Sequence, residues 1–218
     1  MTKQVFTLPA QRPARLAVLI SGGGSNLVAL AQACTDPHFG AEVVGVVADR
    51  QAAGLQWARD KGIPTACLPL EDFPNRESWD EKLAQTVVDF QADLVVSAGF
   101  LKILGPRFLA AFPNRVVNTH NSLLPAFPGI HGPRDAFRAG VKLAGATLFV
   151  VDPGMDTGPI LAQVAVEVRE EDTEATLTER IKTAERAQLI QSIEKMVQGG
   201  WWVEANKAGF ESHPEQLR

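Results

Sequence analysis

The chain has 218 residues, of which 45% are apolar and 21% charged, a composition that excludes a disordered, collagen-like or coiled-coil protein. Its net charge of −4 argues against a general nucleic-acid binder, which would usually be basic. Cys34 and Cys67 are too few for a disulfide framework and predict reduced thiols in a cytoplasmic protein. We find no run of about 18 apolar residues that could span a membrane, and residues 1–15 do not resemble a signal peptide.

The first part of the chain alternates apolar strands with helices. Strands are predicted at residues 15–20, 42–49, 65–68 and 93–98, and helices after the glycine turn at 21–26 and at 51–61 and 77–90. Nearly continuous apolar strands with short links favour a parallel sheet that has helices on both faces.

The pattern changes in the second part of the chain. Strands are predicted at residues 115–119, 144–152 and 160–168, and one long helix at 174–198 with its N-cap at Asp172 or Thr173. We therefore expect an N-terminal nucleotide-fold half, a C-terminal half and two tails, with the bounds 14–112, 113–205, 1–13 and 206–218.

The turn Ser21-Gly22-Gly23-Gly24-Ser25-Asn26 joins the first strand to its helix. Glycines let the backbone approach an anion, and the start of the helix offers free N–H groups and the positive end of its dipole. The run matches neither the dinucleotide fingerprint nor the P-loop. Ser25 and Asn26 add polar side chains, and the run is either a phosphate site or only a tight turn.

Further polar residues follow strand ends or lie on the long helix. Asn118 and His120 lie two residues apart, so they point to the same side of a strand. They either suit stabilisation of an oxyanion or are only a capping asparagine and a structural histidine, which the two residues taken alone favour. Asp156, or Asp152 in the same loop, could support an imidazolium, although aspartate is also common in turns. Glu185 lies at the margin of the apolar stripe of the helix and is either solvated or directed into a cleft. The histidines and cysteines lack zinc-site spacing, so no metal is expected.

Taken together, the motifs resemble the phosphoribosylglycinamide formyltransferases, folate-dependent enzymes of purine biosynthesis. The resemblance runs from about residue 15 to about residue 203 and rests on LAVLISGGGSNL, SAGFLKIL, NTHNSLLPAFPGIHG and VVDPGMDTGPILAQ. It implies an α/β, Rossmann-like formyltransferase fold with a mostly parallel, seven-stranded mixed sheet flanked by helices. It also implies transfer of a formyl group from the co-substrate 10-formyltetrahydrofolate to the amine of glycinamide ribonucleotide, with no metal.

The resemblance also implies roles for individual residues. Asn118, His120 and Asp156 match the catalytic residues, the segment Gly24, Ser25 and Asn26 matches the phosphate site, and Glu185 matches a contact to the glycinamide. The residues that match the folate site are Arg76, Leu101, Lys102, Ile103, Leu104, Asp152, Pro153, Gly154 and Met155.

Four positions depart from the pattern of the family. Asn121 stands where proline is usual, and Lys102 stands where arginine is common, which keeps the charge but loses the planar fork. Thr147 replaces a frequent serine, and Phe149 replaces a frequent histidine and so removes one ligand contact.

Rival functions are a hydrolase of 10-formyltetrahydrofolate, a formyltransferase for another amine, and a non-catalytic nucleotide-binding module. The SGGGSN turn and the single-module length favour the glycinamide substrate. The expected partners are the two small-molecule substrates, without nucleic acid or membrane, and a homodimer is compatible with the sequence.

Overall fold

The computed structural model of the chain describes residues 2–211. They divide into two compact units, one formed by Leu8–Asn118 and the other by the chain from Thr119 onward together with the residues before Leu8. The division falls within strand β6 (Val116–His120), later than the predicted boundary between residues 112 and 113. The shift has a simple cause, because Val116 and Val117 pair with β5 and belong to the sheet of the first unit.

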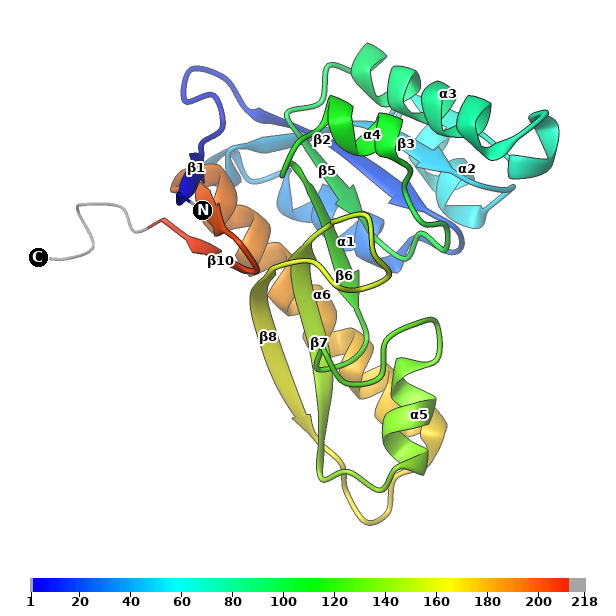
Figure 1. Cartoon of the computed structure of the whole chain (residues 1–218), viewed down its shortest axis with the longest axis vertical. Coiled ribbons are helices and arrows are strands. Elements are labelled where there is room, and N and C mark those ends of the chain that lie inside the picture. Colours follow the sequence, from blue (N-terminus) through cyan, green and yellow to red (C-terminus); the bar gives the residue numbers. More distant parts are fainter. Residues whose placement is uncertain (1, 212–218) are drawn as a thin grey trace, which may run out of the picture. The chain divides into compact units, whose positions relative to one another are not determined.

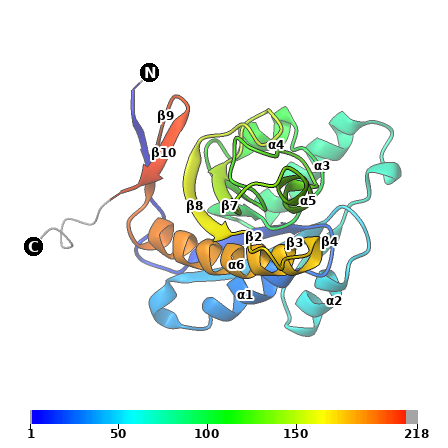
Figure 2. The same cartoon turned by 90° about the horizontal axis from the view of Figure 1, so that it is seen from below.

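The unit Leu8–Asn118 is a parallel sheet with the strand order β6-β5-β2-β3-β4. Its further strands are β2 (Ala14–Ile20), β3 (Ala41–Ala48), β4 (Thr65–Cys67) and β5 (Leu94–Ser97). Its helices are α1 (Ser25–Ala33), α2 (Ala53–Asp60), α3 (Arg76–Asp89) and α4 (Pro106–Ala111), with 3-10 turns η1 (Pro37–Phe39) and η2 (Leu70–Asp72). Helices α1 and α2 lie on one face of the sheet and α3 and α4 on the other (Figure 2).

The apolar runs in the sequence explain this arrangement. Strand β2 is inaccessible to solvent from Leu16 to Ile20, and every residue of β5 is buried. A strand that is buried on both faces needs an apolar side chain at every position rather than at every second one. The carboxyl ends of β2 and β5 lead into the loops 21–24 and 98–105, where open parallel sheets usually bind ligands.

The second unit contains an antiparallel strand pair, β7 (Leu143–Val150) and β8 (Ile160–Glu167). Helix α6 (Glu174–Gln198) runs along this pair and also contacts α5 (Gly132–Arg138) (Figure 1). Its buried side chains Leu177 and Ile181 pack with Ala146 and Val166 in one apolar cluster. The predicted bounds of α6 and its Thr173 cap are confirmed, because Thr173 and Thr176 form a reciprocal capping box.

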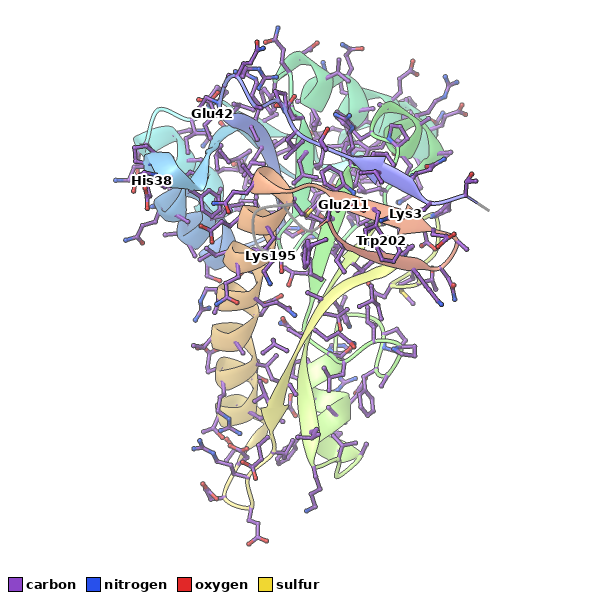
Figure 3. The ribbon with its side chains drawn as sticks, turned by 90° about the vertical axis from the view of Figure 1, so that its left-hand side faces the viewer. Lys3, His38, Glu42, Lys195, Trp202 and Glu211 are labelled. Carbon is purple, nitrogen blue, oxygen red and sulfur yellow. The ribbon has the colours of Figure 1, made fainter. Side chains whose placement is uncertain are left out.

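The predicted tails need correction. Residues 1–13 contain strand β1 (Gln4–Phe6), and residues 206–218 contain β10 (Lys207–Phe210), which forms a hairpin with β9 (Trp201–Glu204). Strand β1 pairs antiparallel with β9, and the Phe6 ring stacks on Trp201. Figure 3 shows Lys3 beside Trp202 and Glu211, where its ammonium group lies over the indole ring and pairs with the carboxylate. The rest of the predicted C-terminal tail, 212–218, lies outside the described residues.

The order of the strands in the second unit is β1-β9-β10-β8-β7, and β10 and β8 are its parallel pair. The α/β class with a mixed sheet flanked by helices is thereby confirmed. Residues 2–211 hold ten strands rather than the seven expected, because β1, β9 and β10 are short strands at the two ends of the chain.

A buried carboxylate anchors the loop that follows β5. Asp80 of α3 is 2% exposed and accepts backbone hydrogen bonds from Gly105, Arg107 and Phe108 at 2.7–3.1 Å. These N–H groups belong to the first turn of α4, which has no intrahelical acceptors for them. A Cβ at position 105 would lie 2.4 Å from the Asp80 carboxylate, so glycine is required there.

We expect Asp80→Ala to lower the free energy of unfolding by about 2–3 kcal/mol, because one buried and two part-buried N–H groups lose a charged acceptor. Chemical denaturation measures this loss. Asp89→Ala removes an exposed aspartate from the same helix and serves as the control, which should change the value little. Equal effects of the two substitutions would contradict the anchoring role of Asp80.

Candidate functional site

The glycine turn has the geometry of an open helix start. Gly24 is the N-cap of α1 with a φ of 73°, a left-handed conformation that favours glycine, and no side chain caps the helix. A Cβ added at Gly22 or Gly23 would meet no atom within 4 Å, and neither has a positive φ. The packing of the chain therefore does not require these two glycines, whereas close approach of a ligand to the backbone would.

The two polar residues of this turn differ in exposure. Ser25 is exposed, whereas Asn26 is 8% exposed and its Oδ1 has no hydrogen-bond partner within residues 2–211. Burial of a polar atom without a partner costs free energy, so such an atom calls for an explanation. Binding of a ligand at the turn would supply one.

The loop 98–105 holds the predicted folate residues of the first unit. Leu101 and Ile103 expose about half of their apolar side chains, at 54% and 49%, whereas Leu104 is buried at 5%. The Arg76 guanidinium lies 5.4 Å from the centre of the Trp79 ring and donates to the Ile103 carbonyl oxygen. Arg76 thus has a structural task in this loop in addition to the role that the resemblance implies.

Ser21 connects the glycine turn to this loop. Its hydroxyl accepts a hydrogen bond of 2.8 Å from the Leu101 N–H and also hydrogen-bonds to Asp49. The Asp49 side chain is fully buried and receives a forked pair of bonds from Arg50 at 2.7 and 3.1 Å. Ser21 belongs to the turn that the sequence singled out, whereas Asp49 was not predicted, and its position at the carboxyl end of β3 was the available signal.

The pKa of Asp49 reflects this network. Burial raises the pKa, but hydrogen bonds from Arg50 and Ser21 lower it, as do the charges of Arg50 and Lys102. The lowering contributions are larger in total, so the pKa of Asp49 lies below the ordinary value for aspartate. The carboxylate is therefore ionised where it holds Ser21 in place.

In the second unit, His120 lies between two oxygen acceptors. Its Nε2 is 3.1 Å from the Phe127 carbonyl oxygen, and its Nδ1 is 3.7 Å from Oδ2 of Asp156. Both side chains are mostly buried, at 11% and 13% exposed. Each ring nitrogen of His120 thus faces an oxygen atom of another residue. Asn118 precedes His120 by two residues on β6, where it pairs with Ser97 in the parallel ladder.

The two aspartates of the loop 152–159 have different tasks. Asp156 has a φ of 57° and accepts from the Gly129 N–H at 2.8 Å, in addition to facing His120. Asp152 accepts from the Gly154 N–H and the Thr157 hydroxyl, as expected of an aspartate that caps a turn. Of the remaining folate candidates in this loop, Pro153 and Gly154 are exposed and Met155 is 56% exposed.

Glu185 is buried rather than solvated. It is 5% exposed on α6, and its Oε1 accepts from the Thr119 hydroxyl at 2.9 Å. The Asn121 amide lies 2.7 Å from both carboxylate oxygens, and its nitrogen faces them because its oxygen would meet only acceptors. Thr119 and Asn121 were not predicted as partners of Glu185, since nothing in the sequence pairs them.

Thr147 and Phe149, two of the four residues that depart from the pattern expected from the resemblance, are both buried in β7. The Thr147 hydroxyl donates to the Ser122 carbonyl oxygen at 2.7 Å and accepts from the Leu124 N–H at 3.0 Å. Thr147 therefore supports the proline-rich loop that follows His120.

Within residues 2–211, no three His, Cys, Asp or Glu side chains gather as metal ligands would. Among the helices of the same residues, none has the length and apolar character needed to cross a membrane.

Comparison with known proteins extends over all the predicted site residues. Residues 14–193 match the sequence model of a family described as formyl transferase. The phosphoribosylglycinamide formyltransferase of Mycobacterium tuberculosis is 46% identical over 198 residues, which cover 91% of this chain and 92% of that protein. The enzyme of the same name from Bacillus subtilis is 37% identical over 172 residues, 78% of this chain and 88% of that protein.

The chain is also similar to solved structures, in fold as well as in sequence. The crystal structure of glycinamide ribonucleotide transformylase 1 from Symbiobacterium toebii superimposes with a TM-score of 0.88 at 37% sequence identity. The match covers 92% of this chain and 95% of that one, so the likeness includes the fold as well as the motifs.

The Asp49 network predicts a pH-dependent stability. A depressed pKa in the folded chain stabilises it above the unfolded value of about 3.9, and this contribution is lost as the pH falls through the folded pKa. Asp49→Asn should lower the free energy of unfolding by about 1.5–3 kcal/mol at pH 7, with a smaller difference below about pH 4. Urea denaturation at both pH values measures this, with exposed Asp60→Asn as the control. A difference independent of pH would contradict the prediction.

Proposed function

Because the chain belongs to the formyl transferase family, we propose that it transfers a formyl group from 10-formyltetrahydrofolate to the amine of glycinamide ribonucleotide. The observation that carries this proposal is the extent of the likeness to a named phosphoribosylglycinamide formyltransferase, 46% identity over 91% of this chain. This range includes the SGGGSN turn as well as the loops after β6 and β7.

The chemistry needs two binding sites and a stabilised oxyanion. The free amine attacks the formyl carbon, a C–N bond forms, and negative charge develops on the formyl oxygen. The bond from that carbon to N10 of the folate then breaks, while a proton leaves the amine and N10 gains one. Binding both substrates makes the encounter effectively unimolecular, and preorganised donors stabilise the intermediate.

We assign the oxyanion to Asn118 and His120. The amide of Asn118 and one N–H of a protonated His120 donate to the formyl oxygen. The other ring N–H keeps the protein acceptor that it faces, which is the Phe127 carbonyl oxygen for Nε2 or the Asp156 carboxylate for Nδ1. The negative charge of Asp156 favours the imidazolium. The 3.7 Å distance between His120 and Asp156 supports this assignment over Asp152, whose oxygen is occupied in its turn.

We assign the substrate phosphate to Gly24, Ser25 and Asn26. The uncapped start of α1 and the open space at Gly22 and Gly23 support this assignment. We assign Glu185 to the glycinamide N–H groups, because its carboxylate is an acceptor for such donors.

The assignment of the folate rests on exposed apolar side chains that flank polar ones. Leu101, Ile103 and Met155 are large apolar residues that remain exposed, as expected of residues that a flat aromatic ligand covers. Lys102, Arg76, Leu104 and the segment Asp152–Met155 complete the proposed folate site. Cytoplasmic location and a homodimer remain predictions from the sequence.

An assay of formyl transfer tests the proposal. The purified chain should convert 10-formyltetrahydrofolate to tetrahydrofolate only when glycinamide ribonucleotide is present, with formylglycinamide ribonucleotide as the product. Release of formate without the ribonucleotide would instead identify a hydrolase. Binding of the ribonucleotide without turnover would identify a nucleotide-binding module.

We expect His120→Ala to lower kcat by about 10²–10³-fold with little change in either KM, because its hydrogen bond strengthens only as charge develops. Asp156→Asn should also lower kcat, since the charge that supports the imidazolium is lost. Steady-state kinetics with both substrates measure these effects. Asp152→Asn should lower kcat less than Asp156→Asn, and the reverse order would exchange their roles.

Asn26→Asp should raise the KM for glycinamide ribonucleotide about tenfold, because it places a negative charge beside the phosphate. The KM for the folate should change less than twofold, and added salt should reduce the effect by screening. Asn206→Asp adds the same charge at an exposed turn and provides the control. Equal rises in both KM values would contradict the placement of the phosphate.

A further inference from the structure

The side chain of Gln163 in β8 binds the loop that follows His120. Gln163 is exposed, yet its amide nitrogen donates to the Leu124 carbonyl oxygen at 2.8 Å and to the Thr147 hydroxyl at 3.1 Å. Thr147 lies directly opposite Gln163 in the ladder of β7 and β8. A primary amide nitrogen has two N–H groups, so these two contacts use both of them.

The Thr147 hydroxyl has no hydrogen-bonding capacity left. It donates to the Ser122 carbonyl oxygen at 2.7 Å and accepts from the Leu124 N–H at 3.0 Å and the Gln163 amide at 3.1 Å. A hydroxyl has one proton and two lone pairs, so all three are used. Because Gln163 occupies one of the lone pairs, it helps to direct the hydroxyl proton toward the loop.

The same loop is tied internally up to the residue before Phe127. The Ser122 hydroxyl donates to the Ala126 carbonyl oxygen at 2.7 Å, and the Ala126 N–H donates to the Leu123 carbonyl oxygen at 3.0 Å. Side-chain donors thus hold the carbonyl groups of three alternate residues, Ser122, Leu124 and Ala126. Phe127 follows with a φ of 54°, which is uncommon for a bulky residue, so its backbone has to be held by the loop.

The Phe127 carbonyl oxygen is the atom that meets the imidazole. It lies 3.1 Å from Nε2 of His120. A carbonyl oxygen only accepts, so this hydrogen bond requires a proton on Nε2. The direction of the ring therefore depends on where the loop places one oxygen atom, and two hydrogen bonds from Gln163 help to fix that loop.

We propose that Gln163 is a positioning residue for His120. It acts through Thr147 and the loop 121–127, which hold the Phe127 carbonyl oxygen where it orients the imidazole with a proton on Nε2. This inference rests on the proposed function, in which His120 donates to the formyl oxygen. A donor that is oriented before charge develops costs no reorganisation during the reaction, so Gln163 contributes to kcat rather than to substrate binding.

The alternative is that Gln163 only joins β8 to the loop and stabilises the fold. Either role would lower the free energy of unfolding of a Gln163 variant, so unfolding does not separate them. Two other measurements do, namely the split between kcat and KM and the exchange of the His120 ring proton with water. A residue that does not position the imidazole changes neither.

Steady-state kinetics compare Gln163→Leu, Thr147→Val and Thr147→Ser. Gln163→Leu removes both donors at similar size and should lower kcat about tenfold, with each KM changed less than about twofold, because a misplaced donor stabilises the transition state less. Thr147→Val should act in the same direction. Thr147→Ser keeps the hydroxyl and should keep kcat within about twofold. Gln191→Leu alters an exposed glutamine of α6 and is the matched control, which should leave all constants unchanged.

A double-mutant cycle tests whether Gln163 acts through His120. Adding Gln163→Leu to His120→Ala should lower kcat by less than about twofold more, because no ring remains to be positioned. Additive effects, an unchanged kcat in Gln163→Leu, or a rise in either KM as large as the fall in kcat would each overturn the proposal.

Proton NMR of the free protein measures the same contact without turnover. The natural chain should show a slowly exchanging ring N–H signal that is absent from His120→Ala, and Gln163→Leu should raise its exchange rate about tenfold or more, because the loop opens more easily. Absence of this signal from the natural chain, or an exchange rate that Gln163→Leu leaves unchanged, would overturn the role of Gln163.

The two measurements distinguish failure of this proposal from failure of the proposed function. A natural chain that transfers no formyl group, but whose ring proton responds to Gln163→Leu, overturns the proposed function and leaves the positioning of His120 in place. A natural chain that transfers formyl normally, with kcat and ring proton both unchanged in Gln163→Leu, overturns only the role of Gln163. Absence of transfer together with an unresponsive ring proton overturns both.

Discussion

A carboxylate that is removed from water has to be hydrogen-bonded, and this requirement organises the loops of the candidate site. Asp80 holds the start of α4 through three backbone N–H groups, and Asp49 holds Ser21, which in turn accepts from the loop 98–105. In the other unit, Asp156 binds the Gly129 N–H while facing His120. Each loop is thus fixed by an acceptor whose removal would leave part-buried or buried donors without that partner.

The regular elements could be predicted because their cause is local. Strand β2 and helix α6 were predicted to within a residue or two, since an apolar run that ends in glycines and a capped helical period are visible in the sequence. The short helices α4 and α5 were missed, because they contain too few residues to show a period. Strand β1 was missed for a different reason, since it exists only by pairing with β9 at the other end of the chain.

The polar contacts of the site could not be derived from the sequence, because each joins residues that lie far apart along the chain. Asp80 lies in a charged helical segment, where the sequence does not distinguish a buried aspartate from a solvated one. Its carboxylate is buried because it accepts from three N–H groups that lie more than twenty residues later in the chain. Glu185 was placed at the margin of an apolar stripe, and only its contacts with Thr119 and Asn121 show how it is held. The left-handed conformation of Asp156 is likewise invisible in the motif MDTGP.

The thiols bear on the route of the formyl group. Burial raises the pKa of Cys34 to about 12, and burial also raises the pKa of Cys67. A thiolate is the nucleophilic form of cysteine, so at neutral pH neither side chain is activated to accept a formyl group as a thioester. The mechanism proposed for this chain therefore needs no covalent carrier. It relies instead on binding the two substrates together, and on donors that are already in place when charge develops on the formyl oxygen.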